Sequence, residues 1–266
     1  MRHPFAALNA IQEQLLSSIE SPFHLISGSE DCTLPEQQDR RWRAFQSHEQ
    51  EIIRTIVEDP RVISWSIENL VRSWHPKCRP LPLGMVCPDP NLIERPPQRT
   101  IPPQSSRPTR LLCLHRIREG AQWDLRRSVS NLCRSELAGW STVMDEEVPR
   151  LRFEQLLRQH AFVVCAQGGG IDPSPKAWLA LLHGAIPIMR SSGLDAAYRQ
   201  LPVMILEDWT AESLSWERLK ACQRALAPWF DEPRHRREVL HRLSLDHWWT
   251  ESTGAAPCGT DAVSPP

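Results

Sequence analysis

The chain has 266 residues, of which 41% are hydrophobic and 24% charged, and its formal net charge is -1. This composition excludes a chain that is disordered or collagen-like over most of its length. The near-neutral charge provides no field that would hold nucleic acid, and no apolar run reaches the roughly 20 residues of a membrane span. We therefore expect a globular protein with no nucleic-acid partner and no transmembrane segment.

The eight Cys residues are scattered along the chain and form no CxxC pair. The first ten residues contain Arg2, His3 and Pro4 and lack the apolar segment of a signal peptide. We therefore expect reduced thiols in a cytoplasmic protein, with neither a disulfide framework nor a metal site.

Residues 1–87 are expected to form a short α/β domain. Apolar residues at helical spacing predict helices over 5–19 and 41–58. Runs rich in β-branched and aromatic residues predict strands over 23–28, 62–67 and 81–85. A complete Rossmann-like domain usually needs more residues, so we expect this one to be abbreviated.

Seven prolines fall within residues 88–108, the clearest boundary in the sequence. Such a segment favours extended polyproline conformation and cannot bury a core, which predicts a linker. The small, polar residues 252–266 are expected to form a disordered tail.

Strands and helices alternate regularly through residues 109–251. Strands are predicted at 110–115, 139–144, 160–166, 185–189 and 203–206. Helices are predicted at 123–137, 150–159, 175–183, 194–198 and 211–226, with basic helical segments following to Trp249. This alternation predicts βαβ units and a parallel sheet.

The segment with the clearest chemical signal is 160–190, where a hydrophobic strand leads to Gly168, Gly169 and Gly170 and then to a helix. Glycines at such a turn let backbone N–H groups approach a ligand, and the following helix terminus favours phosphate. The segment is neither a GxGxxG fingerprint nor a Walker loop. Glycines also serve in tight turns without any ligand, so the pattern alone leaves both interpretations open.

Asp172 and Lys176 follow the glycines. Asp172 can cap the helix or accept a hydrogen bond from a ligand hydroxyl. Lys176 lies in the first helical turn, where a cation opposes the helix dipole. A Lys at that position either faces a bound anion or is an ordinary solvated side chain.

The segment from 160 to 209 resembles the C-terminal core of exostosin-like glycosyltransferases. The matching residues are Gly168, Gly170, Asp172, Lys176, Trp178, Ala180, Leu181, Gly184, Ile186, Pro187, Ile188, Leu201, Pro202, Val203, Asp208 and Trp209. A looser similarity extends to the N-terminal part, at 23–28 with Asp31, at 64–65 with Asn69, and at 75–84.

The resemblance implies a GT-B type α/β fold, with two Rossmann-like domains of parallel sheets facing a cleft. A nucleotide sugar would bind the C-terminal domain as substrate, with no further cofactor, and a glycan or lipid-linked acceptor would bind near the N-terminal domain. Transfer would be inverting and metal-independent, aided by positive charge on the departing diphosphate. An Arg fork suits a diphosphate, and four arginines are candidates for that charge. Position alone favours Arg116 and Arg126 over Arg118 and Arg127.

A general base is expected near the first strand: Asp31 is the candidate, Glu30 precedes it in the loop after the strand, and His24 lies within the strand. Leu179 replaces the family Glu that is expected to bind the ribose. This departure and the short first domain raise the alternative of a degenerate relative that binds nucleotide or glycan, or scaffolds a partner, without turnover. Peripheral membrane contact and oligomer contact also stay open, as does an unrelated oxidoreductase.

Overall fold

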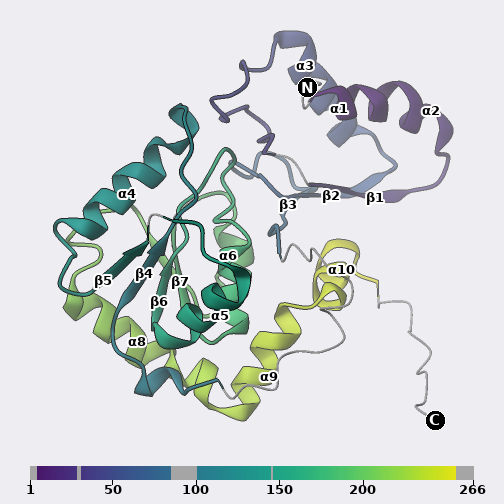
Figure 1. The fold of residues 1–266 in the computed structure, drawn as a ribbon. Coiled ribbons are helices and arrows are strands. Elements are labelled where there is room, and N and C mark those ends of the chain that lie inside the picture. Colours follow the sequence, from purple (N-terminus) through teal and green to yellow (C-terminus); the bar gives the residue numbers. More distant parts are fainter. Residues whose placement is uncertain (1–4, 29–30, 85–100, 145, 256–266) are drawn as a thin grey trace.

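The computed structural model describes residues 5–28, 31–84, 101–144 and 146–255. It is an α/β protein with two parallel sheets, one of three strands in the order β1-β2-β3 and one of five in the order β5-β4-β6-β7-β8 (Figure 1). The expected Rossmann-like α/β class with parallel sheets is therefore confirmed.

The three-stranded sheet belongs to the N-terminal domain. Its strands are β1 Phe23–Ser27, β2 Val62–Ile67 and β3 Cys78–Pro80. Its helices are α1 Ala6–Ala10, the π-helix η1 Ile11–Leu15, α2 Leu16–Ser18 and α3 Ser47–Glu58. The helix predicted over 5–19 is thus present as three consecutive helical pieces.

Two N-terminal predictions were wrong in their limits. The helix predicted from residue 41 begins only at Ser47, because a capping box joins Gln46 and Glu49 at that point. The third strand pairs Cys78–Pro80 with β2, whereas residues 81–85 were predicted to form it. Leu81 continues the ladder only by donating its N–H to the Ile67 carbonyl, 2.9 Å away.

The five-stranded sheet belongs to the C-terminal domain. Its strands are β4 Leu111–Leu114, β5 Ser141–Met144, β6 Phe162–Val164, β7 Ile186–Arg190 and β8 Met204–Leu206. The helices are η3 Gln104–Ser106, η4 Ala121–Trp123, α4 Asp124–Arg134, α5 Arg150–Gln159, α6 Lys176–Leu182, α7 Asp195–Tyr198, α8 Trp216–Asp231, α9 Pro233–Arg242 and α10 Leu245–Thr253. Helix α8 begins five residues later than the predicted residue 211.

Alternating side chains of this sheet supply two hydrophobic cores. On β4, Leu112 joins the core formed with α5 and α6, while Leu111 and Cys113 join the core formed with α4 and α8. Helices therefore cover both faces of the sheet, the arrangement that a buried parallel sheet requires.

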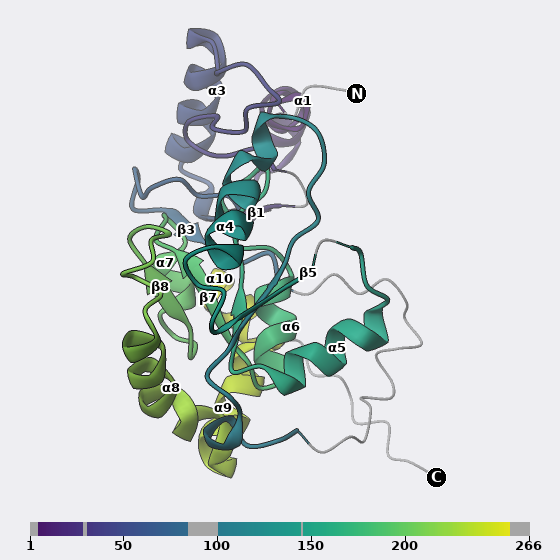
Figure 2. The same cartoon turned by 60° about the vertical axis from the view of Figure 1, so that its left-hand side comes forward.

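The two domains share one continuous core. The core on the α5–α6 face also contains Trp65 of β2 and Ile56 of α3 from the N-terminal domain. The start of α4 also lies beside the N-terminal domain (Figure 2), where Arg40 Nη1 is 3.4 Å from Asp124 Oδ2. The domains are thus packed together over a broad surface.

The chain returns to the N-terminal domain at its C-terminal end, as Figure 1 shows for α10. Ser64 Oγ donates to the Ser252 carbonyl at 2.9 Å, and Arg79 Nη1 donates to the Glu251 carbonyl at 2.9 Å. The predicted C-terminal domain, 109–251, grouped most of α10 with the five-stranded sheet instead. The disordered tail predicted from residue 252 starts too early, because α10 extends to Thr253; residues 256–266 lie outside the described residues.

The predicted linker 88–108 also ends earlier than expected. Residues 88–100 lie outside the described residues, but Gln104 and Arg107 are buried against the C-terminal domain. Gln104 Nε2 donates to the Ala161 carbonyl, and Arg107 Nη1 donates to the Leu157 carbonyl. These contacts make residues 104–108 part of the domain that follows.

Candidate functional site

The order β5-β4-β6-β7-β8 places the first strand of the C-terminal domain between the second and the third. The connection that leaves β4 leads to β5 on one side of the sheet, and the connection that leaves β6 leads to β7 on the other side. In doubly wound sheets of this order, ligands bind outside the carboxyl ends of the strands at that reversal. The loops that begin after Leu114 and after Val164 meet there, and the second of them carries the three glycines.

Lys176 lies at this reversal. Its Nζ donates to the carbonyl of Leu114 at 2.9 Å and to the carbonyl of Val164 at 3.4 Å, which are the last residues of β4 and β6. Burial, and to a lesser degree the charge of Arg126, lowers the pKa of Lys176 to about 8. A partly buried ammonium group therefore bridges the ends of the two strands, and the solvated-surface interpretation is wrong.

Side chains pack closely against each of the three glycines. None of them has a positive φ. A Cβ at Gly168 would lie 3.0 Å from Arg126 Nη2, one at Gly169 would lie 2.5 Å from Arg41 Nη2, and one at Gly170 would lie 2.9 Å from Asn69 Cγ. The groups that come close to the glycines are side chains of both domains.

Asp172 ties the loop to both domains. Its carboxylate accepts hydrogen bonds from the backbone N–H groups of Leu83 (3.0 Å) and Ser174 (2.7 Å), and from Tyr198 Oη at 3.0 Å. Burial raises its pKa to about 6. Asp172 therefore has a structural role in this loop, since its oxygens are occupied by protein groups.

Ser174 follows in an unfavourable conformation. Among the described residues it is the one non-glycine residue with a positive φ, 82°. Its Oγ accepts a hydrogen bond from the Lys176 N–H at 3.3 Å. A backbone held in this region costs on the order of 1 kcal/mol, and such strain is common at functional loops.

Arg126 of α4 lies beside the glycine loop. Its Nε donates to the Gln167 carbonyl at 3.1 Å, and its guanidinium carbon lies 4.8 Å from the centre of the Trp123 ring. Burial lowers the pKa of Arg126. Arg116 is placed differently, because its side chain is 56% exposed and is 3.7 Å from Glu147. Of these two arginines, Arg126 is therefore the one held against the loop.

Asp31 comes from the N-terminal domain and reaches the same loop. Its carboxylate is paired with Arg41, which also binds the buried Asp39 through Nε at 2.9 Å. Gly169 packs against this pair. Asp31 thus lies beside the glycine loop as one partner of an ion pair.

Two of the cavities beside the loop share Arg126 and Ser174. The first, here called the basic cavity, has a volume of about 710 Å³ and is lined by Leu114, His115, Arg116, Ile117, Arg118, Arg126, Glu146, Glu147, Val148, Arg150, Phe153, Ser174 and Lys176. The second, the inter-domain cavity, has a volume of about 510 Å³ and is lined by Asp31, Arg41, Trp42, Glu68, Asn69, Leu83, Trp123, Arg126, Gly168, Gly169, Gly170, Asp172, Ser174 and Pro175.

The basic cavity has five cationic side chains and two anionic ones in its wall. It also contains His115, which is 4% exposed. His115 Nδ1 lies 3.2 Å from Ser130 Oγ, whereas Nε2 has no hydrogen-bond partner among the described residues. Burial lowers the pKa of His115 to about 4, so the ring is neutral at pH 7. This set of charges favours an anionic ligand.

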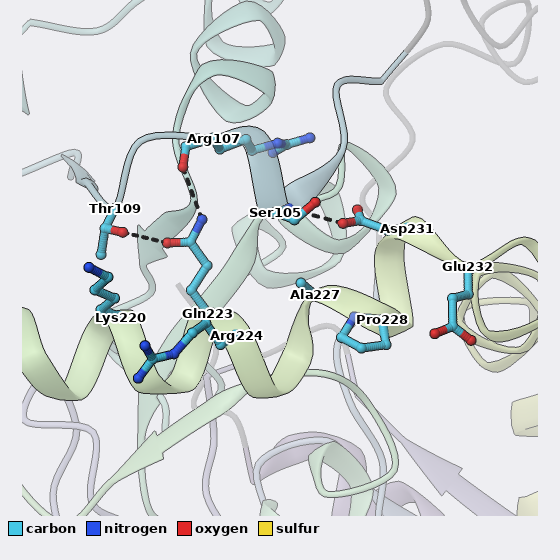
Figure 3. A pocket seen from close by; sticks show the side chains of 10 residues that line it. All are labelled: Ser105, Arg107, Thr109, Lys220, Gln223, Arg224, Ala227, Pro228, Asp231 and Glu232. Atoms are coloured by element: carbon cyan, nitrogen blue, oxygen red, sulfur yellow. Dashed lines mark hydrogen bonds between the residues drawn. The ribbon is translucent and has the colours of Figure 1, made fainter.

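A third cavity, of about 460 Å³, lies at the other end of the domain between η3 and α8 (Figure 3). Several of its polar groups bind one another: Thr109 Oγ1 and the Arg107 carbonyl are hydrogen-bonded to Gln223, and Asp231 accepts a hydrogen bond from the Ser105 N–H. These bonds hold the end of the connecting segment on α8.

Five residues that line these cavities were not predicted from the sequence: Arg41, His115, Trp42, Trp123 and Glu68. Arg41 was assigned to a helix, and His115 has no neighbour in sequence that would identify it. Asn69 was identified in the sequence through the resemblance. Its Oδ1 accepts hydrogen bonds from the backbone N–H groups of Ile171 and Asp172.

Comparison with models of known protein families gives no match, and no curated protein is significantly similar to this chain. None of the described helices is long and apolar enough to cross a membrane. In the same part of the chain, no group of three or more His, Cys, Asp or Glu residues is arranged to hold a metal ion.

Proposed function

We propose that this protein is a GT-B type glycosyltransferase that moves a sugar from a nucleotide sugar to a glycan or lipid-linked acceptor. The observation that carries the proposal is the position of Lys176. Its ammonium group bridges the ends of β4 and β6 at the point where doubly wound sheets bind their ligands, in the wall of a cationic cavity.

The donor diphosphate would occupy the basic cavity. Lys176 uses two of its three N–H groups on carbonyls and keeps the third for an anion. Arg126 adds a second cation that is already oriented by its hydrogen bond to the loop. Preorganised cations of this kind stabilise a diphosphate leaving group as negative charge builds up on it. Val148 and Phe153 provide an apolar wall for the nucleobase of the donor.

A second candidate is a degenerate relative that binds a nucleotide or glycan without turnover. The observation in its favour is Leu179, which stands where the family Glu would bind the ribose. Its side chain is partly buried against the main core and accepts no hydrogen bond. Ribose recognition would then have to come from other residues.

Calorimetry with UDP, GDP, CMP and their sugars tests the proposal, followed by a transfer assay with the nucleotide sugar that binds. We expect one nucleoside diphosphate to bind with a micromolar Kd, and the corresponding sugar to be transferred. Binding without turnover across all acceptors would favour the degenerate relative. Binding of none of these compounds would contradict the transferase and leave a degenerate relative that binds a glycan or scaffolds a partner.

A further inference from the structure

The proposed diphosphate site uses Lys176 and Arg126, and one further polar group in the wall of the same cavity has no role in it. His115 comes directly after Leu114, the last residue of β4, and it is 4% exposed. Among the described residues that line the basic cavity, it is the one whose side chain has a buried polar atom without a hydrogen-bond partner. That atom is Nε2.

The other ring nitrogen of His115 is held by the domain core. Nδ1 lies 3.2 Å from Ser130 Oγ and 3.5 Å from Cys113 Sγ, and both of these residues are buried. Neither of them lines the basic cavity. The ring is therefore anchored on its Nδ1 side, and Nε2 is the nitrogen left for a group that enters the cavity.

Nε2 is shielded from solvent as well as unpartnered. A buried polar group without a partner costs about 1–3 kcal/mol, and nearly all such groups in folded proteins are satisfied. Bulk water does not reach Nε2 in the unliganded protein. Its chain neighbour Arg116 lines the same cavity with a side chain that is 56% exposed, so this part of the wall can rearrange when a ligand enters.

The charges around the ring indicate what kind of ligand suits it. Burial lowers the pKa of His115 to about 4, and the charge of Lys176 acts in the same direction, so the ring is uncharged beside a cation. An acceptor nitrogen at that place would be a natural partner for the ammonium group. Lys176 donates instead to the carbonyls of Leu114 and Val164, and Nε2 stays without a partner. This arrangement favours an N–H at Nε2, which needs an acceptor from the ligand.

We propose that His115 is a phosphate-binding residue of the basic cavity, and that its Nε2–H donates a hydrogen bond to an oxygen of the phosphate group that Lys176 binds. The identification of this phosphate with the diphosphate of a nucleotide sugar rests on the proposed transferase function. Ser130 Oγ–H donates to Nδ1 in this arrangement and keeps the ring proton on Nε2. The uncharged ring adds a directed donor to a wall that already has five cationic side chains.

The test uses the full chain with isotope-labelled histidines. Two-dimensional NMR spectra that correlate the ring nitrogens with the ring C–H protons show which nitrogen carries the proton, before and after titration with inorganic pyrophosphate, UDP and GDP. The His115 signals are those that are missing in His115→Gln. His160 is the internal control, because its Nδ1 lies 2.8 Å from the Leu156 carbonyl, its Nε2 lies 3.0 Å from Thr142 Oγ1, and it does not line the basic cavity.

We expect the His115 proton on Nε2, and we expect the Nε2 signal to shift when pyrophosphate or a nucleotide binds, while the His160 signals stay in place. These spectra are recorded on the wild type, so they decide the question even if a variant does not fold.

Calorimetry with the same compounds compares variants whose folding is checked by their melting temperatures. His115→Phe should lower the affinity by about tenfold or more, the change that corresponds to one hydrogen bond to a charged group. His115→Gln, whose amide keeps an N–H donor, should lose less than about threefold. His48→Phe, at an exposed position of α3, is the matched control and should bind as the wild type does.

A wild type that binds a nucleotide while the Nε2 signal stays in place would overturn the role of His115 and leave the transferase function standing. Full affinity in His115→Phe, or a ring proton on Nδ1, would do the same. Pyrophosphate that binds with the Nε2 shift, while neither nucleotide binds, would support the phosphate site and contradict the nucleotide-sugar function. Binding of none of the three compounds would overturn the phosphate site itself.

Discussion

Asn69 of the N-terminal domain accepts a hydrogen bond from the backbone N–H of Ile171 in the C-terminal domain, with 2.9 Å between Oδ1 and N. The same oxygen lies 3.2 Å from the Asp172 nitrogen. The glycine loop is therefore held from across the domain boundary, and the inter-domain cavity depends on how the domains are packed.

Replacing Asn69 by Ala should lower the free energy of unfolding by about 2 kcal/mol or more. The change leaves two backbone N–H groups of the loop without their acceptor, and an unsatisfied buried donor costs about 1–3 kcal/mol. Urea unfolding measures this loss. Asn131→Ala, at an exposed position of α4, is the control and should change stability by less than about 0.5 kcal/mol.

Gly193→Ala tests the domain contact from the other side. A Cβ there would lie 2.5 Å from the carbonyl carbon and oxygen of Val71, which are backbone atoms that cannot turn away. We expect a loss of about 1–3 kcal/mol in thermal or urea unfolding, the usual cost of overpacking. Gly139→Ala has no atom within 4 Å of the new Cβ. Equal stability of the two variants would show that the domains can separate at little cost.

The alternation of strands and helices in residues 109–251 predicted the five-stranded sheet because each element repeats its own hydrophobic period. The position of Lys176 at the ends of β4 and β6 could not be predicted in that way, since it depends on strand order rather than on local pattern. Arg41 was missed for a related reason. Its loop conformation depends on Asp39 and on Gly169, which is 128 positions further along the chain.

Ser174→Gly should raise stability by about 1 kcal/mol, because glycine adopts the positive φ of 82° without the penalty of a Cβ. Thermal unfolding gives the comparison. Ser128→Gly, in the middle of α4, should have the opposite sign and lower stability by about 0.5 kcal/mol. A destabilising Ser174→Gly would contradict the strain at this position.

Lys176 should also make stability depend on pH. Its pKa is about 8 in the folded protein, below the ordinary lysine value of 10.5, so the unfolded chain binds more protons between these two values. Stability relative to Lys176→Met should therefore rise from pH 8 to pH 10.5, by on the order of 3 kcal/mol, and stay level below pH 7. Urea unfolding of both proteins across this range gives the difference. A stability difference that does not change with pH would show that the ammonium group lies in solvent.

Calorimetric titration of UDP, GDP and CMP into the wild type, Lys176→Met, Arg126→Ala and Arg127→Ala tests the central claim most directly. We expect one nucleotide to bind the wild type with a micromolar Kd and to lose about tenfold or more in affinity in Lys176→Met and Arg126→Ala, since a hydrogen bond to a charged group contributes about 1.5–3 kcal/mol. Arg127, whose side chain is 39% exposed and paired with Asp124, should be replaceable with less than about a twofold change. Equal affinities in all four proteins, or no binding at all, would contradict a nucleotide site at the end of β4 and β6.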